Sequence, residues 1–188
     1  CLEELAVLLV KSGRQAEAHA VYQELQAASQ PEALLAATVR IAQTLQVCGE
    51  TDWSAELYQA ALQMQPRGDR EQRVLAGLAR LHTARNEDGR AAELWALLLT
   101  RHANSALAGE AALARARHLS ESGQTEAALE LYRAVFDQQT TATDEQVSVA
   151  LWAAGQLAEK SGQTAEAVRW YARLDRQFPE LSYHDAVL

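Results

Sequence analysis

Hydrophobic and small residues recur along most of the chain at intervals of three and four positions, and two stretches with this pattern are nearly identical. "SGQTEAALELYRAVF" occupies residues 122–136 and "SGQTAEAVRWYARL" occupies residues 161–174. Intervals of three and four place apolar residues on one face of a helix, whereas a half-buried strand needs intervals of two. The same helical spacing occurs on both sides of the short turns that separate these stretches. The chain is therefore predicted to form pairs of amphipathic helices joined by short turns.

These two stretches belong to a repeat that occurs five times. The turn positions are separated by 36, 37, 37 and 39 residues, and they are Gly13, Gly49, Asn86, Gly123 and Gly162. Seven residues before each turn the chain has a small residue: Ala6, Ala42, Ala79, Ala116 and Gly155. Five residues after it, a second small residue stands at Ala18, Ser54, Ala91, Ala128 and Ala167. Nine residues after it, an aromatic ring stands at Tyr22, Tyr58, Trp95, Tyr132 and Tyr171. Because only 6% of the residues are aromatic, five aromatics in one column indicate a true repeat.

The columns have a physical rationale in packed helix pairs. Small residues on facing helices allow two backbones to approach closely, and an aromatic ring one turn later fills the space between pairs. Each turn position needs a left-handed backbone, which glycine adopts without strain. Prolines fall between copies, where helices stop, at Pro31, Pro66 and Pro179. Residues predicted to cap the start of a second or first helix are Thr51, Asp88 and Asp144.

This arrangement of columns resembles the tetratricopeptide repeat (TPR), a helix–turn–helix unit of about 34 residues. The resemblance covers essentially the whole chain. It implies an all-α right-handed solenoid, a single superhelical domain with repeats at approximately 1–30, 31–66, 67–103, 104–141 and 142–179, and 180–188 as the start of a further helix. The copies depart from the family in being longer, and the first-helix aromatic of the family is replaced by Leu9, Leu45, His82, Leu119 and Ala158. We therefore expect lengthened helices or longer connections between repeats.

Composition narrows the classes of function. A formal net charge of −8 argues against general nucleic-acid binding, including binding by the pentatricopeptide class, because phosphate contacts need a basic surface. The densest apolar run, at 94–99, is too short for a membrane span. The chain begins at Cys1, which is either a lipidated mature N-terminus or the boundary of a segment cut from a longer protein, and the latter is the expectation. Cys1 and Cys48 form no metal-type cluster and no disulfide framework.

The sequence offers little that suggests catalysis. It contains no nucleophile elbow, phosphate-binding loop or dinucleotide turn. The histidines have no metal-ligand spacing; they are His19, His82, His102, His118 and His184. We therefore predict that this chain is not an enzyme and uses neither metal nor cofactor.

The TPR resemblance implies that first helices line a concave surface. Candidate partner-binding residues on that face are Gln43, Arg73, Arg80, Arg117, Trp152, Gln156 and Glu159. Arg80 and Arg117 occupy the same position in consecutive repeats, so they are predicted to lie side by side and to bind carboxylates of an acidic partner segment. The alternative is that they pair with Glu110 or other neighbours. Trp152 is either a recognition residue or packs against an adjoining repeat. Trp53 and Trp170 are expected to pack on the convex side or at seams between repeats.

The preferred interpretation is a scaffold that binds a partner protein or peptide in its groove. By resemblance and composition the chain is similar to periplasmic scaffolds of bacterial envelope machines, including those of exopolysaccharide synthesis and export. A cytoplasmic assembly factor would have the same sequence features. Two further functions stay open: a passive spacer or accessory domain of a larger enzyme or secretion pore, and a polysaccharide-contacting surface. The sequence leaves the oligomeric state undefined.

Overall fold

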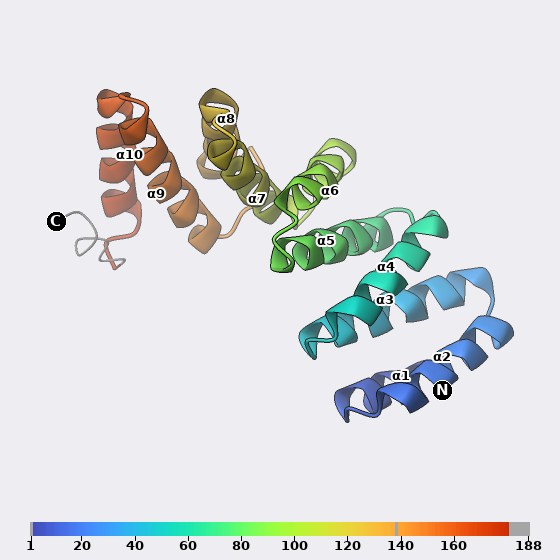
Figure 1. Ribbon diagram of the computed structural model, residues 1–188. Helices are drawn as coiled ribbons and strands as arrows, with labels where there is room; N and C mark the ends of the chain where they lie inside the picture. Colours follow the sequence, from blue (N-terminus) through green and yellow to red (C-terminus); the bar gives the residue numbers. More distant parts are fainter. Residues whose placement is uncertain (1, 138, 181–188) are drawn as a thin grey trace. The chain divides into compact units, whose positions relative to one another are not determined.

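A computed structural model describes residues 2–137 and 139–180, and this part of the chain is built from helices and their connections (Figure 1). Within it there are ten α-helices and no strand, which confirms the all-α prediction. The helices are α1 (Leu2–Lys11), α2 (Gln15–Ala28), α3 (Pro31–Val47), α4 (Thr51–Gln63), α5 (Asp69–Ala84), α6 (Asp88–Arg101), α7 (Ala108–Glu121), α8 (Thr125–Phe136), α9 (Asp144–Lys160) and α10 (Thr164–Gln177).

The five repeats share one type of turn. Every turn position has a positive φ: 73° at Gly13, 84° at Gly49, 59° at Asn86, 75° at Gly123 and 79° at Gly162. In the first turn the Gly13 N–H donates to the Val10 carbonyl at 3.0 Å, and the Arg14 N–H donates to the Leu9 carbonyl at 2.9 Å. The same two bonds recur in the other four turns, so each first helix ends in a Schellman motif. The predicted need for a left-handed residue at these positions is confirmed.

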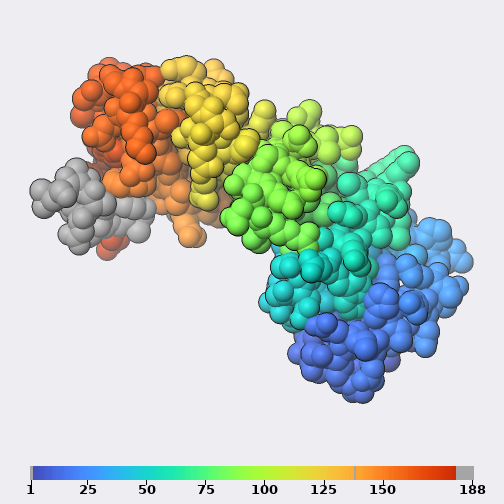
Figure 2. Space-filling view, in the orientation of Figure 1, coloured from blue at the N-terminus to red at the C-terminus, as the bar shows by residue number. Residues whose placement is uncertain are grey.

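The chain forms two compact units, Cys1–Leu94 and Trp95–Leu188, and their boundary falls inside α6. In the first unit α1 packs on α3, α3 packs on α5, and α4 also contacts α5. In the second unit α7 and α8 both pack against α9, and α10 packs against α9. Within each unit, segments close in sequence occupy neighbouring blocks of the surface (Figure 2).

Both columns of small residues are buried in all five copies. Ser54, the one polar member, donates a hydrogen bond from its Oγ to the carbonyl of Ala42 at 2.8 Å. Ala42 belongs to the small column on the facing helix, so this bond joins the two columns directly. The observation confirms that small residues let the paired helices approach closely.

The aromatic column fills the junctions between repeats. Tyr22, Tyr58, Trp95 and Tyr132 are buried. The Tyr22 hydroxyl lies 3.0 Å from Oγ1 of Thr38, on the first helix of the next repeat. Because Thr38 donates its own proton to the Leu34 carbonyl at 2.8 Å, Tyr22 is the donor to Thr38. A ring at the end of one repeat thus contacts the first helix of the following one.

Tyr171 is the exception, since it is only half-buried. Its ring lies against Gly155 of its own hairpin, where a Cβ would stand 2.4 Å from the Tyr171 Cε1 atom. That this ring also fills a junction between hairpins stays a prediction, because residues 181–188 lie outside the described part of the chain. The predicted further helix at 180–188 lies outside the described residues apart from Glu180.

Tryptophans strengthen two junctions, which corresponds to seam packing, one of the two predicted alternatives. The Trp53 ring centroid lies 5.2 Å from that of His19 and 6.5 Å from that of Tyr22, both in the preceding repeat. Trp170 is buried, lies 5.9 Å from Phe136, and carries the Arg133 guanidinium 5.3 Å above its ring. These contacts combine apolar burial with a cation–π interaction.

Ion pairs that link residues about one repeat apart also cross these junctions. They are Glu3–Arg40 at 2.9 Å, Glu32–Arg70, Asp52–Arg85 at 2.5 Å, Arg133–Glu166 at 2.5 Å and Asp137–Arg173 at 2.7 Å. Exposed pairs contribute only about 0–1 kcal/mol each. Their main effect is to favour one register of neighbouring hairpins.

The predicted N-caps are wrong by one residue. Thr51, Asp88 and Asp144 are the first residues of their helices. At that position the two aspartates stabilise their helices by interacting with the positive end of the helix dipole. The cap of α9 is Thr143, whose Oγ1 accepts the Gln146 N–H at 3.3 Å while Gln146 Oε1 accepts the Thr143 N–H at 3.0 Å. This reciprocal pair is a capping box.

The longer copies have a simple structural basis. Helices α3 and α9 each contain 17 residues, and irregular segments follow α6 and α8. Pro31 begins α3, Pro66 lies between α4 and α5, and Pro179 follows α10, so the prolines mark the seams as predicted. None of the described helices is long and apolar enough to cross a membrane.

Candidate interaction groove

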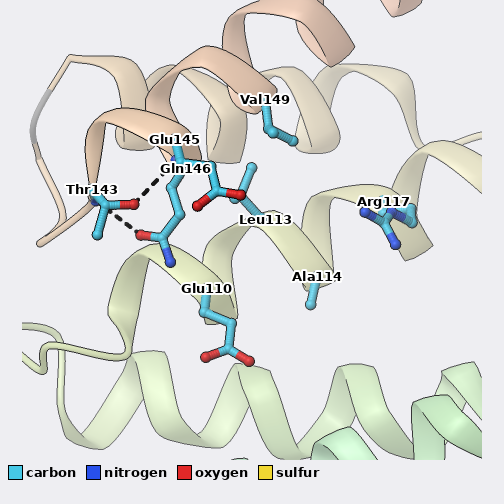
Figure 3. Close-up of a pocket in the computed structure, with 8 residues that line it drawn as sticks. All are labelled: Glu110, Leu113, Ala114, Arg117, Thr143, Glu145, Gln146 and Val149. Carbon is cyan, nitrogen blue, oxygen red and sulfur yellow. Dashed lines mark hydrogen bonds between the residues drawn. The ribbon is translucent and has the colours of Figure 1, made fainter.

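A hollow lies in the second unit, between the first helices of the last two repeats (Figure 3). Its volume is about 490 Å³, within the range of ligand-binding clefts. The lining residues are Glu110, Leu113, Ala114 and Arg117 from α7, and Thr143, Glu145, Gln146 and Val149 from α9 and its cap.

Helical periodicity explains why these side chains share the groove. On α7, Glu110, Leu113 and Arg117 follow one another at intervals of three and four residues, with Ala114 next to Leu113, so they form one stripe along the helix. On α9, Glu145 and Val149 are four residues apart and form a second stripe. The opposite faces of both helices are apolar and buried, with Ala112 and Ala116 on α7 and Ala150 on α9 in the core. Burial of these alanines turns the two lining stripes outward.

The groove has an acidic end and a basic end. Glu110 and Glu145 lie near the starts of α7 and α9, while Arg117 lies at the other end of the α7 stripe (Figure 3). Seven residues separate Glu110 from Arg117, which corresponds to about 10 Å along a helix that rises about 1.5 Å per residue. Leu113, Ala114 and Val149 provide apolar wall between these ends.

Arg117 is exposed, and it forms no hydrogen bond or ion pair with any residue in the described ranges 2–137 and 139–180. The positive charge of Arg117 affects the Tyr132 hydroxyl. Burial raises the pKa of Tyr132, and Arg117 opposes that rise. The guanidinium therefore stands at the groove with its donors available to a ligand.

The other predicted site residues fall on two separate units. Gln43 is half-buried on α3, and Arg73 and Arg80 are exposed on α5, all in the first unit. Trp152, Gln156 and Glu159 continue the α9 stripe beyond Val149 in the second unit, because each follows the previous one by three or four residues. The structure thus brings Arg117 into the same groove as the start of the α9 stripe. The predicted neighbourhood of Arg80 and Arg117 stays a prediction.

Trp152 has features of both a recognition residue and a packing residue. It is half-buried, packs at the edge of the core, and its ring centroid lies 5.4 Å from that of Tyr171 at an angle of 52°. The Tyr171 hydroxyl donates to Oε2 of Glu159 at 3.4 Å. Burial raises the pKa of Tyr171, and the neighbouring Glu159 carboxylate raises it further. Trp152, Tyr171 and Glu159 form a connected patch on the last hairpin.

Sequence reasoning missed several groove residues, namely Thr143, Glu145, Gln146 and Val149. Its set on α9 began at Trp152. Extending the same helical stripe by one and two turns toward the N-terminus leads from Trp152 to Val149 and Glu145. Leu113, by contrast, stands at the position equivalent to Trp152 and was within reach of the repeat alignment.

The lining combines charged groups with apolar wall. Its charged groups are one guanidinium and two carboxylates, and the remaining groups are apolar or part of the α9 cap. Among the described residues, no three His, Cys, Asp or Glu side chains are placed to hold a metal ion. His82 Nδ1 lies 2.6 Å from Oε2 of Glu87 at the α5–α6 turn, and this hydrogen bond, together with Arg90, lowers the pKa of Glu87.

Comparison with known proteins finds similarity only among solved structures. No protein-family model and no curated protein sequence matches this chain. Among solved structures, YrrB, a TPR protein with an unusual peptide-binding site, is 17% identical with a TM-score of 0.72, over 100% of this chain and 91% of that one. A tetratricopeptide repeat protein from Parabacteroides merdae is 17% identical with a TM-score of 0.71, over 95% of this chain and 66% of that one. The TPR-like repeats of a putative kinesin light chain from Podosopora anserina are 19% identical with a TM-score of 0.68, over 97% of this chain and 95% of that one.

The chain has the TPR fold. The resemblance inferred from the small and aromatic columns is thereby confirmed at the level of fold. In TPR terms, α7 and α9 are the first helices of the fourth and fifth repeats, and the groove lies between two helices of the kind predicted to line the concave face.

Proposed function

We propose that this TPR chain is a protein-interaction scaffold that binds an extended segment of a partner in the groove between α7 and α9. The observation that carries the proposal is Arg117, an exposed guanidinium at one end of a groove with apolar walls. YrrB, whose structure is similar, is a TPR protein with a peptide-binding site, which supports the same use of this fold.

The groove specifies the chemistry of the segment. Arg117 suits a carboxylate, since a guanidinium binds both oxygens at once. Leu113 and Val149 suit an apolar side chain, and Glu145 at the far end suits a cation. The acidic end of the groove, marked on α7 by Glu110, lies about 10 Å along that helix from Arg117, which matches about three residues of an extended chain at about 3.3 Å each. The expected ligand therefore has an acidic and a basic residue three positions apart, with an apolar residue between them.

A peptide array tests this proposal. Synthetic peptides with Glu and Arg three positions apart around a leucine are compared with the same peptides in which Glu is replaced by Gln. Binding of the fluorescein-labelled peptides to the wild-type chain is measured by anisotropy. We expect Arg117→Glu to weaken binding of the Glu peptides at least tenfold and to remove the preference for Glu over Gln.

Arg169→Glu is the matched control, because Arg169 is exposed on α10 and does not line the groove. It makes the same change in net charge. Equal losses in the two variants, or unchanged binding by Arg117→Glu, would contradict a ligand carboxylate at Arg117.

We also propose that the scaffold works in the periplasm, within a bacterial envelope assembly such as one for exopolysaccharide synthesis or export. Support comes from resemblance and from the Ala- and Arg-rich composition of the repeats. Immunodetection in periplasmic and cytoplasmic fractions of the source cells tests the compartment, and recovery only with the cytoplasm would refute it. If the chain is instead a passive spacer, wild type and Arg117→Glu will recover the same partners.

A polysaccharide-contacting surface is the remaining candidate function, and the half-buried pair Trp152 and Tyr171 is the observation that favours it. Titration with anionic and amino-sugar polymers should then change the tryptophan fluorescence of wild type but much less that of Trp152→Phe. An unchanged signal in wild type would exclude this use of the patch.

A further inference from the structure

The capping box of α9 lies inside the groove. Gln146 is half-buried and lines the groove together with Thr143, its partner in the box (Figure 3). Its Oε1 atom accepts the Thr143 N–H at 3.0 Å. Because a backbone N–H needs an acceptor, this bond decides which way the side-chain amide is turned: the oxygen faces Thr143 and the nitrogen faces away.

The amide nitrogen of Gln146 is therefore a donor with a fixed direction. Figure 3 shows it on the side of the amide that is turned away from Thr143. It forms no hydrogen bond with any residue of the described ranges 2–137 and 139–180. A primary amide has two N–H groups, and leaving such a donor unmet is costly once a ligand displaces solvent from the groove. A ligand that fills the groove is thus expected to present an acceptor to Nε2.

Gly109 at the start of α7 makes room for this side chain. A Cβ at Gly109 would stand 2.5 Å from Gln146 Oε1 and 2.7 Å from the Thr141 carbonyl oxygen, well inside ordinary contact distance. The Gly109 N–H donates to that same carbonyl at 2.9 Å. The missing side chain and this hydrogen bond hold the segment before α9 against α7, so the position of the Gln146 amide is set from both helices.

The other repeats lack this arrangement. Fourteen residues before the turn, where α7 has Gly109, the first helices α3, α5 and α9 have Leu35, Gln72 and Ser148. Sixteen residues before the turn, where α9 has Gln146, the equivalent residues of the second, third and fourth repeats are Ala33, Arg70 and Leu107. Helices α3, α5 and α7 also have no side-chain hydrogen bond at the N-cap. A capped glutamine opposite a glycine is thus special to the helix pair that forms the groove.

We propose that Gln146 binds the main chain of the partner segment by donating a hydrogen bond from Nε2 to a backbone carbonyl of the ligand. This inference rests on the proposed function of the groove. Gln146 is next to Glu145 and one turn before Val149, so the carbonyl belongs to the part of the ligand that carries the basic residue. Every peptide residue has such a carbonyl, so this contact adds affinity for an extended chain, whereas Arg117 and Glu145 select its charges.

One substitution separates this contact from the capping box. Gln146→Glu keeps an oxygen acceptor for the Thr143 N–H, and glutamate serves in capping boxes as glutamine does, but the amide donor is lost. The variant should therefore unfold at the same urea concentration as wild type. Gln139→Glu is the matched control, because it makes the same change in charge at an exposed position that does not line the groove. By anisotropy with the Glu–Leu–Arg peptides, we expect Gln146→Glu to bind about fivefold more weakly than Gln139→Glu.

Modified peptides identify the ligand atom. In each member of a series, one backbone amide in or next to the Glu-to-Arg stretch is replaced by a trans alkene, which keeps the geometry of the peptide bond but has no carbonyl oxygen. One of these peptides should bind wild type and Gln139→Glu about fivefold more weakly than the parent peptide does. The same peptide should bind Gln146→Glu as well as the parent peptide does, because the donor is already absent.

Arg117→Glu keeps the two proposals apart. If binding depends on Arg117 but Gln146→Glu binds as well as Gln139→Glu, the groove holds its partner without Gln146, and the assignment of a ligand carbonyl to Nε2 is overturned. The same follows if each alkene peptide loses equally on wild type and on Gln146→Glu. If no peptide binds in a way that depends on Arg117, the proposed function fails, and the role of Gln146 fails with it.

Discussion

Gly77 occupies a place in α5 that only glycine fits. A Cβ at this position would stand 2.3 Å from Cζ and 2.6 Å from the hydroxyl oxygen of Tyr58, whereas ordinary contact begins at 3.4 Å. Tyr58 is 1% exposed, and its hydroxyl donates to Oε1 of Gln46 at 3.2 Å. The ring has no solvent to move into. Gly77→Ala is therefore expected to destabilise the first unit although alanine is the better helix former.

The magnitude follows from three opposing contributions. Alanine in place of glycine inside a helix stabilises by about 0.5–1 kcal/mol. Overpacking a full core typically costs about 1–3 kcal/mol. Displacing the Tyr58 hydroxyl from Gln46 removes a hydrogen bond that contributes about 0.5–1.5 kcal/mol. The expected net loss in the free energy of unfolding is about 1–3 kcal/mol.

Two other glycines provide controls. Gly89 lies in α6 with nothing within 4 Å of a built Cβ, so Gly89→Ala should be neutral or slightly stabilising. Gly155 has the same crowding, with Tyr171 Cε1 at 2.4 Å, but that ring is half-exposed and can swing outward. Gly155→Ala should therefore lose less stability than Gly77→Ala.

Urea denaturation followed by far-ultraviolet circular dichroism measures all three variants. The reasoning fails if Gly77→Ala is as stable as Gly89→Ala. It also fails if Gly155→Ala loses more than Gly77→Ala, because freedom of the ring would then not control the cost. Tyr58→Leu combined with Gly77→Ala provides a further check, since removing the ring should make the added methyl group harmless.

Three further changes test other parts of the structure. Burial raises the pKa of Tyr58 to about 12, although the charge of Arg80 opposes this rise, so the folded chain keeps a proton that the unfolded chain loses near pH ~10. The protonated Tyr58 hydroxyl contributes its full stabilisation below that pH, and the free energy of unfolding falls by about 1.4 kcal/mol per pH unit as the pH rises toward 12. Urea denaturation at alkaline pH should therefore show a shallower fall of this free energy with pH for Tyr58→Phe than for wild type. Thr143→Ala removes the α9 capping box and should cost about 1 kcal/mol by the same denaturation, whereas Thr141→Ala, at an exposed position just before it, should cost little. Tyr132→Ala should cost about 3–5 kcal/mol, but Trp152→Ala only about 1–2 kcal/mol because its ring is half-exposed; equal losses would show that Trp152 is a core residue.

The sequence was sufficient to predict the fold because the repeat makes local information redundant. A positive φ was expected at each turn, and the five turn positions adopt it, including Asn86, the one position where glycine is replaced. The small columns could be predicted because close helix packing excludes larger side chains at those positions. Cap positions were less predictable, because Thr143 and Asp144 are both good capping residues in sequence and the choice depends on where the first helical hydrogen bond forms.

The candidate groove was predictable only in part, and the reason lies in what each residue's role depends on. Arg117 could be placed on the correct face because its position relative to Gly123 is fixed within one helix. Whether an arginine is available to a partner depends on the neighbouring repeats: Arg133 pairs with Glu166 of the following repeat, and Arg173 pairs with Asp137 of the preceding one. Such pairs join residues 33 and 36 positions apart, so they follow from the step between hairpins and not from any short pattern.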